Sequence, residues 1–150
     1  MDDKIYASAI RMLAGREHSC FELRTKLENK GHNTADIDAV IEQLLQDKHL
    51  NESRFTEMFV RSKINRGAGP IKIRLELQQR SVDESLIDEY LEFNQPEWFA
   101  RAMEVRCKRF GENLPKEANE KAKQIRFLQQ RGFTQNQIMN VIVSNAIIIK

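Results

Sequence analysis

The sequence has few of the residues on which disulfide-stabilised and metal-binding proteins depend. Its 150 residues include two cysteines, Cys20 and Cys107, which are too few and too far apart for a disulfide framework or a Cys-x-x-Cys metal motif. The three histidines, His18, His32 and His49, stand singly, and no two have the spacing of metal ligands. We therefore expect reduced cysteines and no metal site.

Long hydrophobic runs are also absent. The longest aliphatic run lies near the C-terminus and is far shorter than the roughly 20 residues that span a bilayer. The N-terminus reads Met-Asp-Asp-Lys and lacks the basic region and apolar stretch of a signal peptide. These features predict a cytoplasmic protein that does not bind membranes. The apolar tail at residues 146–150 has no assigned role, and it would favour aggregation if exposed.

Motifs for phosphate binding and catalysis are missing as well. The patterns Gly-x-x-x-x-Gly-Lys-Ser/Thr and Gly-x-Gly-x-x-Gly do not occur. Residues 67–70, Gly-Ala-Gly-Pro, superficially resemble an anion-binding loop but fit a short turn with proline at the start of the next helix better. Arg106 and Lys108 flank Cys107 and would favour its thiolate, although an ordinary thiol is the simpler interpretation. We expect no catalytic residues, no cofactor and no enzymatic activity.

Glycine and proline are scarce, and their positions mark helix ends. Four glycines follow helix-like stretches, where a left-handed residue is favourable: Gly31, Gly67, Gly111 and Gly132. The three prolines, Pro70, Pro96 and Pro115, each open such a stretch. Ser19 and Glu22 have the spacing of a capping box. Because apolar residues recur at spacings of three and four, and no segment alternates with period two, the sequence predicts an all-α fold.

The sequence also repeats itself. The pattern of a helix, a tight turn after a basic residue and a second helix places Ile37 in register with Ile87, 50 residues later, and with Ile138, a further 51 residues on. Another amphipathic helix precedes each copy, at about residues 4–15, 52–66 and 96–110. This period predicts three tandem three-helix, helix-turn-helix-like repeats in an elongated, curved array. We place the repeats at residues 1–50, 51–94 and 95–150.

The charges are nearly balanced in total but unevenly distributed. Lysine and arginine number 24, aspartate and glutamate 22, and the formal net charge is +2. Residues 54–80 carry a net +5, residues 81–97 a net −6, and residues 98–131 again +5. Two basic blocks of this kind suit a polyanionic partner, either nucleic acid or an acidic protein surface. Trp98, Phe99, Phe110 and Phe127 could stack on bases, but their helical spacing favours a place in the core.

Each repeat also carries specific motifs. The first repeat carries Arg16-Glu17-His18-Ser19, Glu22-Leu23, Lys26-Leu27 and Lys30-Gly31. The second carries Leu50 to Phe55, Phe59-Val60, Gly67-x-Gly69-Pro70, Ile73-Arg74-x-Glu76-Leu77 and Val82. The third carries Phe127-Leu128, Arg131-Gly132-Phe133 and Ile138. Together these motifs resemble the RecX family, the bacterial regulators of the RecA recombinase, and the resemblance covers about residues 5–143. Glu52 replaces the usual Asp, and Ser81 replaces the usual Gly, so we expect a less left-handed turn after Arg80.

The resemblance implies three tandem three-helix repeats and a non-enzymatic function. It implies binding to RecA and to the RecA–single-stranded DNA filament. Inhibition of its recombinase, ATPase and coprotease activities would modulate recombination, DNA repair and the SOS response. We further expect a monomer and weak direct DNA binding. The residues that we predict to contact the filament are the basic ones of the second and third repeats: Arg61, Lys63, Arg66, Lys72, Arg74, Arg106, Lys108, Arg109, Lys123 and Arg126.

A stand-alone DNA-binding module with tandem helix-turn-helix-like units is the alternative. Such a module needs a recognition helix rich in Arg, Asn or Gln, whereas the third helices of the first two repeats are acidic. In the last repeat the corresponding residues are uncharged, so DNA contact there stays open: Gln135, Asn136, Gln137 and Asn140. A DNA titration without RecA would separate the two interpretations.

Overall fold

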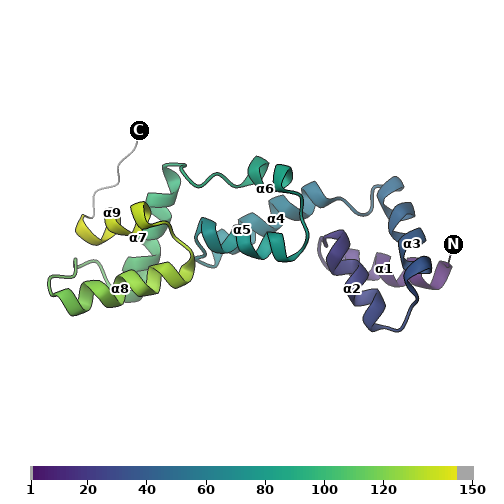
Figure 1. Cartoon of the computed structure of the whole chain (residues 1–150), viewed down its shortest axis with the longest axis horizontal. Coiled ribbons are helices and arrows are strands. Elements are labelled where there is room, and N and C mark those ends of the chain that lie inside the picture. The colour runs from purple at the N-terminus through teal and green to yellow at the C-terminus, as the bar shows by residue number, and fades with distance from the viewer. Residues whose placement is uncertain (1, 145–150) are drawn as a thin grey trace. The chain divides into compact units, whose positions relative to one another are not determined.

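The computed structural model describes residues 2–144, and within this range it contains nine helices and no strand. The helices are α1 (Asp3–Gly15), α2 (Cys20–Asn29), α3 (Thr34–Gln46), α4 (Glu52–Asn65), α5 (Pro70–Gln79), α6 (Glu84–Tyr90), α7 (Glu97–Phe110), α8 (Ala118–Arg131) and α9 (Gln135–Val143) (Figure 1). The predicted all-α fold is confirmed. The apolar tail at 146–150 lies outside the described residues. No helix between residues 2 and 144 is long and apolar enough to cross a membrane.

Local sequence signals set most helix ends. At α2, the Ser19 hydroxyl accepts from the Glu22 N–H while the Glu22 carboxylate accepts from the Ser19 N–H, which confirms the predicted capping box. Thr134 and Gln137 form a second capping box at α9. The four glycines predicted to end helices all have positive φ, between +87° and +97°. Pro70 opens α5 and Pro96 directly precedes α7, but Pro115 lies outside α8, which starts only at Ala118.

The turn after Arg80 departs from the sequence prediction. Ser81 has a φ of +57°, so the turn is left-handed even without glycine, and the expected weaker left-handed character was wrong. The hydrogen bond from the Val82 N–H to the Leu77 carbonyl, 3.2 Å long, parallels that from His32 to Leu27 in the first repeat. The repeat therefore imposes its turn geometry on a residue that disfavours it.

The repeat predicted from the sequence is confirmed in the burial of its aligned positions. Most of the aligned apolar residues are at most 4% exposed: Leu23, Leu27, Ile37, Val40 and Ile41; Ile73, Leu77, Ile87 and Leu91; Leu128, Ile138, Val141 and Ile142. Two positions differ. A buried Gln124 stands where the other repeats bury Leu23 and Ile73, and Tyr90, aligned with Val40 and Val141, is only half-buried. Each copy thus buries nearly the same apolar pattern, as a helical repeat requires.

The chain divides into two compact units, and the division runs through the second repeat. One unit consists of residues up to 59 together with 77–87. In it, α1, α2 and α3 pack on one another around a core that includes Ile5, Leu23, Leu44 and Leu50. Glu22 also joins this unit's segments, because its carboxylate pairs with both Arg16 and Arg80 at 3.1 Å.

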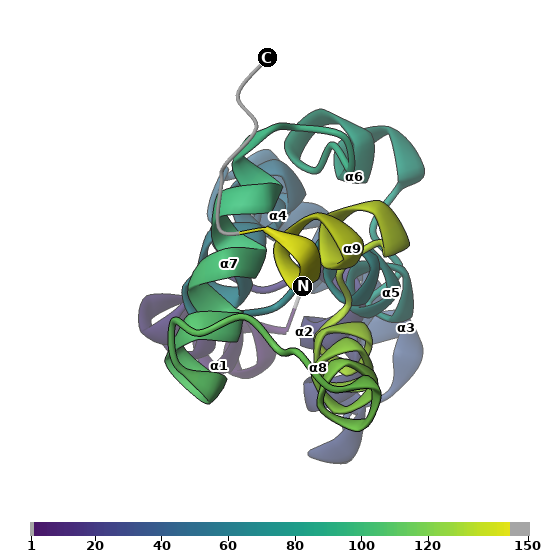
Figure 2. The same ribbon diagram turned by 90° about the vertical axis from the view of Figure 1, so that its left-hand side faces the viewer.

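The other unit consists of residues 60–76 and everything after 87. Here α7, α8 and α9 pack together in pairs, as both Figure 1 and Figure 2 show. Trp98 on α7 is 1% exposed and packs edge-on against Phe133, with 6.4 Å between the ring centroids. Its indole N–H donates to the Glu92 carbonyl at 2.8 Å, which satisfies the buried donor. Trp98 therefore belongs to the core, as predicted.

Candidate functional site

A basic pocket of about 620 Å³ lies in the second unit. It is lined by the end of α4, the turn after it, the middle of α7, the last part of α8 and the start of the α8–α9 turn. Five cationic side chains and one carboxylate line it: Arg66, Arg101, Lys108, Arg109, Arg131 and Glu104. The apolar lining includes Ile64, Val105 and Phe133. The pocket therefore combines a strong positive charge with apolar surface.

Two turns that are distant in sequence hold this pocket together. The Gly69 N–H donates to the Arg131 carbonyl at 2.7 Å, and the Ile71 N–H donates to the Gly132 carbonyl at 2.9 Å. The backbones approach so closely that a Cβ on Gly69 would lie 2.4 Å from the Gly132 carbonyl carbon, and one on Gly132 would lie 2.4 Å from the Lys72 Cβ. Residues 67–70 thus form a short turn between helices, as interpreted from the sequence. The N–H groups of Gly69 and Ile71 donate to backbone carbonyls rather than to an anion.

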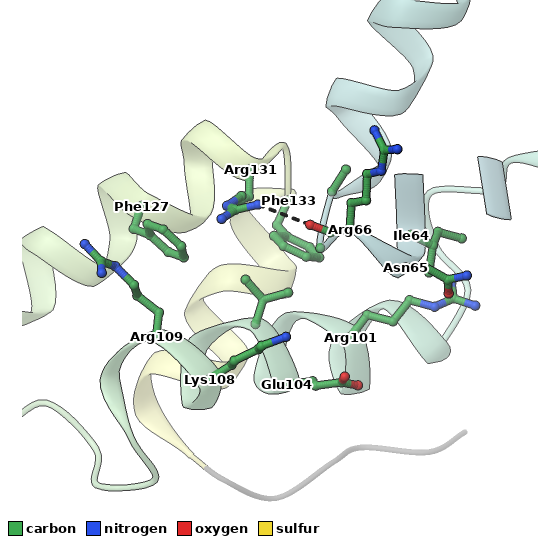
Figure 3. A pocket seen from close by; sticks show the side chains of 13 residues that line it. Ile64, Asn65, Arg66, Arg101, Glu104, Lys108, Arg109, Phe127, Arg131 and Phe133 are labelled. Atoms are coloured by element: carbon green, nitrogen blue, oxygen red, sulfur yellow. Dashed lines mark hydrogen bonds between the residues drawn. The ribbon is translucent and has the colours of Figure 1, made fainter. Parts of the chain in front are cut away.

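Aromatic rings hold three of the five cations in place. The guanidinium of Arg101 lies 4.6 Å from the Trp98 ring centroid. Those of Arg109 and Arg131 lie 5.6 and 5.1 Å from the Phe127 centroid, and Figure 3 shows Phe127 between them. Because cation–π contact restrains each guanidinium before a ligand arrives, less conformational entropy is lost on binding.

A hydrogen bond between elements also fixes Arg131. Its Nη1 donates to the Arg66 carbonyl at 3.2 Å, the dashed line in Figure 3. None of the five pocket cations is within 4.0 Å of a carboxylate oxygen of residues 2–144, including Glu104. Their positive charges are therefore not neutralised by ion pairs within this part of the chain, and the pocket suits an anionic ligand.

The structure divides the ten predicted filament contacts into different environments. Three of them line the pocket: Arg66, Lys108 and Arg109. Two form ion pairs: Lys63 and Arg74. Four are exposed outside the pocket lining, namely Arg61, Lys72, Lys123 and Arg126, and the last, Arg106, is buried. The Lys63 ammonium lies 3.0 Å from Glu76, and the Arg74 guanidinium lies 2.8 Å from Asp88. These two cations are partly neutralised, so the lysines and arginines are not equivalent.

Arg106 was wrongly placed on the basic surface. Its side chain is 0% exposed, and its Nη1 donates to the carbonyls of Gly111 at 3.5 Å and Asn113 at 3.4 Å. The guanidinium therefore binds the backbone that follows α7 instead of a partner. Arg106 and Arg109 are three residues apart and are therefore neighbours on the surface of one helix. This spacing alone does not tell which of the two faces the core.

Sequence reasoning left Arg101 and Arg131 out of the predicted contacts, although both line the pocket. A signal for Arg101 existed, because it lies seven residues before Lys108 and so shares its helix face. Arg131 had no such signal. Its position depends on the contact between the α8–α9 turn and the α4–α5 turn, which only the tertiary structure brings together.

The uncharged start of α9 is less available for DNA than the sequence left open. Gln137 is 2% exposed, and its side chain caps the Thr134 N–H at 2.9 Å and donates to the Phe93 carbonyl at 2.8 Å. Both the oxygen and the nitrogen of this side-chain amide therefore form hydrogen bonds within the protein. Gln135 and Asn136 remain exposed. Of the aromatic residues predicted for the core, Phe99, Phe110 and Phe127 are only half-buried, and Phe127 lines the basic pocket.

The cysteines and histidines take no part in this pocket. Burial, followed by the neighbouring Glu52 carboxylate, raises the pKa of the Cys20 thiol to about 12, so this thiol stays protonated. Burial is also the main reason that the pKa of His18 lies below its usual value. Among residues 2–144, no three His, Cys, Asp or Glu side chains are grouped as metal ligands would be.

The helices and the pocket define a three-helix-repeat protein with a pocket lined by cations. The chain matches three family models, described as the first, second and third three-helix domains of RecX, at residues 6–44, 51–91 and 95–142. It therefore belongs to the RecX family, as the sequence motifs indicated.

Named relatives and solved structures agree with this family. The regulatory protein RecX of Halorhodospira halophila is 45% identical over 131 residues, which cover 87% of this chain and 81% of that protein. That of Chromohalobacter salexigens is 39% identical over 134 residues, covering 89% and 88%. The crystal structure of RecX from Lactobacillus salivarius has a TM-score of 0.76 at 20% identity, covering 94% of each chain, and supports the fold alone.

Proposed function

We propose that this protein binds the RecA–single-stranded DNA filament and inhibits the recombinase, ATPase and coprotease activities of RecA. Membership of a family whose members are named regulatory proteins supports the regulatory part of this proposal. RecA filaments carry nucleic-acid phosphates, so their regulator needs cations that are available to a partner.

The basic pocket is the observation that carries the proposal. Its five cations have no ion-pair partner among residues 2–144, and three of them are held by aromatic rings. Such cations attract phosphates without first breaking an internal salt bridge. The pocket lies in the unit that contains most of both basic blocks predicted from the sequence.

We further propose that the protein acts by binding rather than by catalysis. Glu104 is the one carboxylate that lines the pocket, and the other lining side chains there are cationic, apolar or amide groups. A carboxylate with no nucleophile or imidazole beside it lacks the partner that acid–base or covalent catalysis requires. Cytoplasmic location, a monomeric state, the repeat limits at 1–50, 51–94 and 95–150, and a curved array stay predictions.

ATP hydrolysis by RecA on single-stranded DNA tests the proposal. Stoichiometric addition of the purified protein is expected to slow hydrolysis and strand exchange. A variant with Arg101→Gln and Lys108→Gln removes two pocket charges and is expected to need about tenfold more protein for the same inhibition. A double variant with Lys4→Gln and Arg11→Gln, two exposed positions on α1, is the matched control for the loss of two charges. An absence of inhibition by the unmodified protein would refute the proposal.

A DNA titration without RecA tests the stand-alone module. For a filament regulator we expect weak binding that falls steeply with salt and has no sequence preference. Tight, sequence-specific binding would favour the alternative instead. The internal hydrogen bonds of Gln137 weigh against that outcome, because they remove a residue of the first turn of α9 from base recognition.

A further inference from the structure

The basic pocket has an apolar interior that phosphate binding alone does not require. Phe133 lies beside Arg131 in Figure 3 and lines the same pocket, but it is only 2% exposed and offers little surface to a ligand. Ile64 and Val105 add aliphatic surface, and the amide of Asn65 supplies a donor and an acceptor. A site for phosphate alone would need only the cations. The apolar surface indicates that part of the ligand is flat or apolar.

The size and chemistry of the pocket fit one nucleotide. Its volume of about 620 Å³ lies within the range of roughly 300–1,000 Å³ that is typical of small-molecule sites. A nucleotide offers a phosphate for the cations, a base face for the half-buried Ile64 and Val105, and polar base edges for Asn65. An acidic peptide without apolar side chains, such as polyglutamate, would satisfy the cations but would leave the apolar surface uncovered.

Charge outside the pocket indicates a strand rather than a free nucleotide. Lys123 and Arg126 are exposed on α8, the helix that also supplies Phe127 and Arg131 to the pocket. A free nucleotide would fill the pocket without reaching these cations, whereas neighbouring phosphates of a strand would continue toward them. The strand must be single, because bases of a duplex are stacked and their faces are not accessible.

We propose that this pocket receives one unstacked base of single-stranded DNA, with the adjoining phosphates held by Arg66, Arg101 and Lys108. The inference deepens the proposed function, on which it rests for the presence of single-stranded DNA, by naming the part of the nucleoprotein that the pocket contacts. Arg109 and Arg131, held on Phe127, complete the positive rim. The base is recognised by its flat face, so little preference among bases is expected.

Comparison of an intact strand with an abasic strand tests the proposal directly. Fluorescence anisotropy measures binding of the full chain, without RecA, to labelled oligothymidylate and to a strand of equal length and charge that lacks bases. The abasic strand is expected to bind about tenfold more weakly, because it loses the base contact but keeps every phosphate. Equal affinity for the two strands would overturn the proposal.

A variant that fills the pocket provides the second measurement. Val105→Trp places a large side chain on the apolar surface without changing any charge, and it is expected to bind both strands alike, at the level of the abasic strand. Leu75→Trp is the matched control, because Leu75 is 53% exposed on α5 and does not line the pocket. Circular dichroism and thermal melting establish that both variants fold. If folded Val105→Trp still prefers the intact strand, the base does not occupy this pocket.

Competition with other anions separates the remaining sources of negative charge. Thymidine monophosphate and a polyglutamate peptide are expected to displace the strand only at concentrations at least 100-fold above those of unlabelled oligothymidylate. Displacement by the free nucleotide at comparable concentration would overturn the assignment to a strand, and displacement by polyglutamate would overturn the assignment to nucleic acid. The RecA assay is independent of these outcomes. If the protein inhibited RecA but bound intact and abasic strands equally, only this further inference would be refuted.

Discussion

Ser81 adopts a backbone conformation that its side chain disfavours. Its backbone has a φ of +57°, a conformation in which the Cβ of an L-residue crowds the following carbonyl. The left-handed turn persists because the Val82 N–H bonds back to the Leu77 carbonyl and because Leu77, Val82 and Ile87 are buried on either side. The burial of these neighbours outweighs the local strain.

Replacement of Ser81 by glycine is therefore expected to stabilise the protein. Relief of strain in the folded state exceeds the added entropy of the unfolded chain, and the free energy of unfolding should rise by about 0.5–1 kcal/mol. Urea denaturation measures this change. Ser85→Gly, in the helical part of the same segment, should instead lower stability by about 0.5 kcal/mol. A loss of stability in Ser81→Gly would show that the turn is not strained.

Glu22 is one of the residues that make the first unit sensitive to acid. Burial raises the pKa of its carboxyl, but hydrogen bonds from Arg16, the Ser19 N–H and Arg80 outweigh burial and hold it below the usual value of 4.5. Because the pKa is lower in the folded chain, the folded state favours the ionised form. The resulting stability is fully present above pH 4.5 and is lost as the pH falls through the folded pKa.

Glu22→Gln should consequently flatten the dependence of stability on pH. The variant is expected to be less stable than the unmodified protein at pH 7, and the difference should shrink as the pH falls below about 4.5. Urea unfolding of both proteins at pH 7, 5, 4 and 3 measures this difference. Taking the difference cancels the contribution that other carboxyls, such as Asp47, make to the free energy of unfolding of both proteins. If the difference in the free energy of unfolding stayed constant with pH, the lowered pKa of Glu22 would not contribute to stability.

Among the elements, the two turns that meet beside the pocket are packed most closely. The α4–α5 turn contributes Gly69 and the α8–α9 turn contributes Gly132, and each has room for only a hydrogen at Cα. Gly132 also has a φ of +97°, which disfavours any other residue. Through these turns Arg131 is brought to the pocket that Arg66 also lines.

Alanine at Gly132 is expected to destabilise the second unit by more than about 2 kcal/mol, since backbone strain adds to a clash with Lys72. Gly69→Ala should also destabilise, through the clash alone. Gly15→Ala is the control, because it has a helical position with nothing within 4 Å. Thermal unfolding measures all three. If Gly132→Ala melted like Gly15→Ala, the close contact between the turns would be wrong.

For the whole molecule, the small net charge conceals where the available charge lies. The total is +2, yet five cations surround one pocket while others, such as Lys63 and Arg74, are paired with carboxylates. Ion pairing, rather than the number of lysines and arginines, decides which charges can attract a partner.

Binding to single-stranded DNA should accordingly depend strongly on salt. If all five pocket cations contact phosphates, the logarithm of affinity should fall against the logarithm of salt concentration with a slope of up to about 3.5. Lys108→Gln should reduce the slope by about 0.7, and Arg11→Gln should leave it unchanged. Anisotropy titrations between 50 and 300 mM KCl measure the slopes. An unchanged slope in Lys108→Gln would remove this lysine from the interface.

The sequence by itself determined the helices, the repeat and the family. Helix ends follow from local chemistry, as at Ser19, Glu22 and Gly31, and the apolar spacing around Ile37, Ile87 and Ile138 follows from the period of a helix. These signals act over a few residues, so they can be read without knowing where the chain goes next.

Only the tertiary structure decided which charges are available and where they meet. Arg106 and Arg109 are both basic and lie on one helix, yet the first is buried against backbone carbonyls and the second lines the pocket. Arg131 reaches the pocket only because two glycine turns pack together. The physical reason is that the environment of a side chain depends on contacts between segments distant in the sequence, which local spacing does not encode.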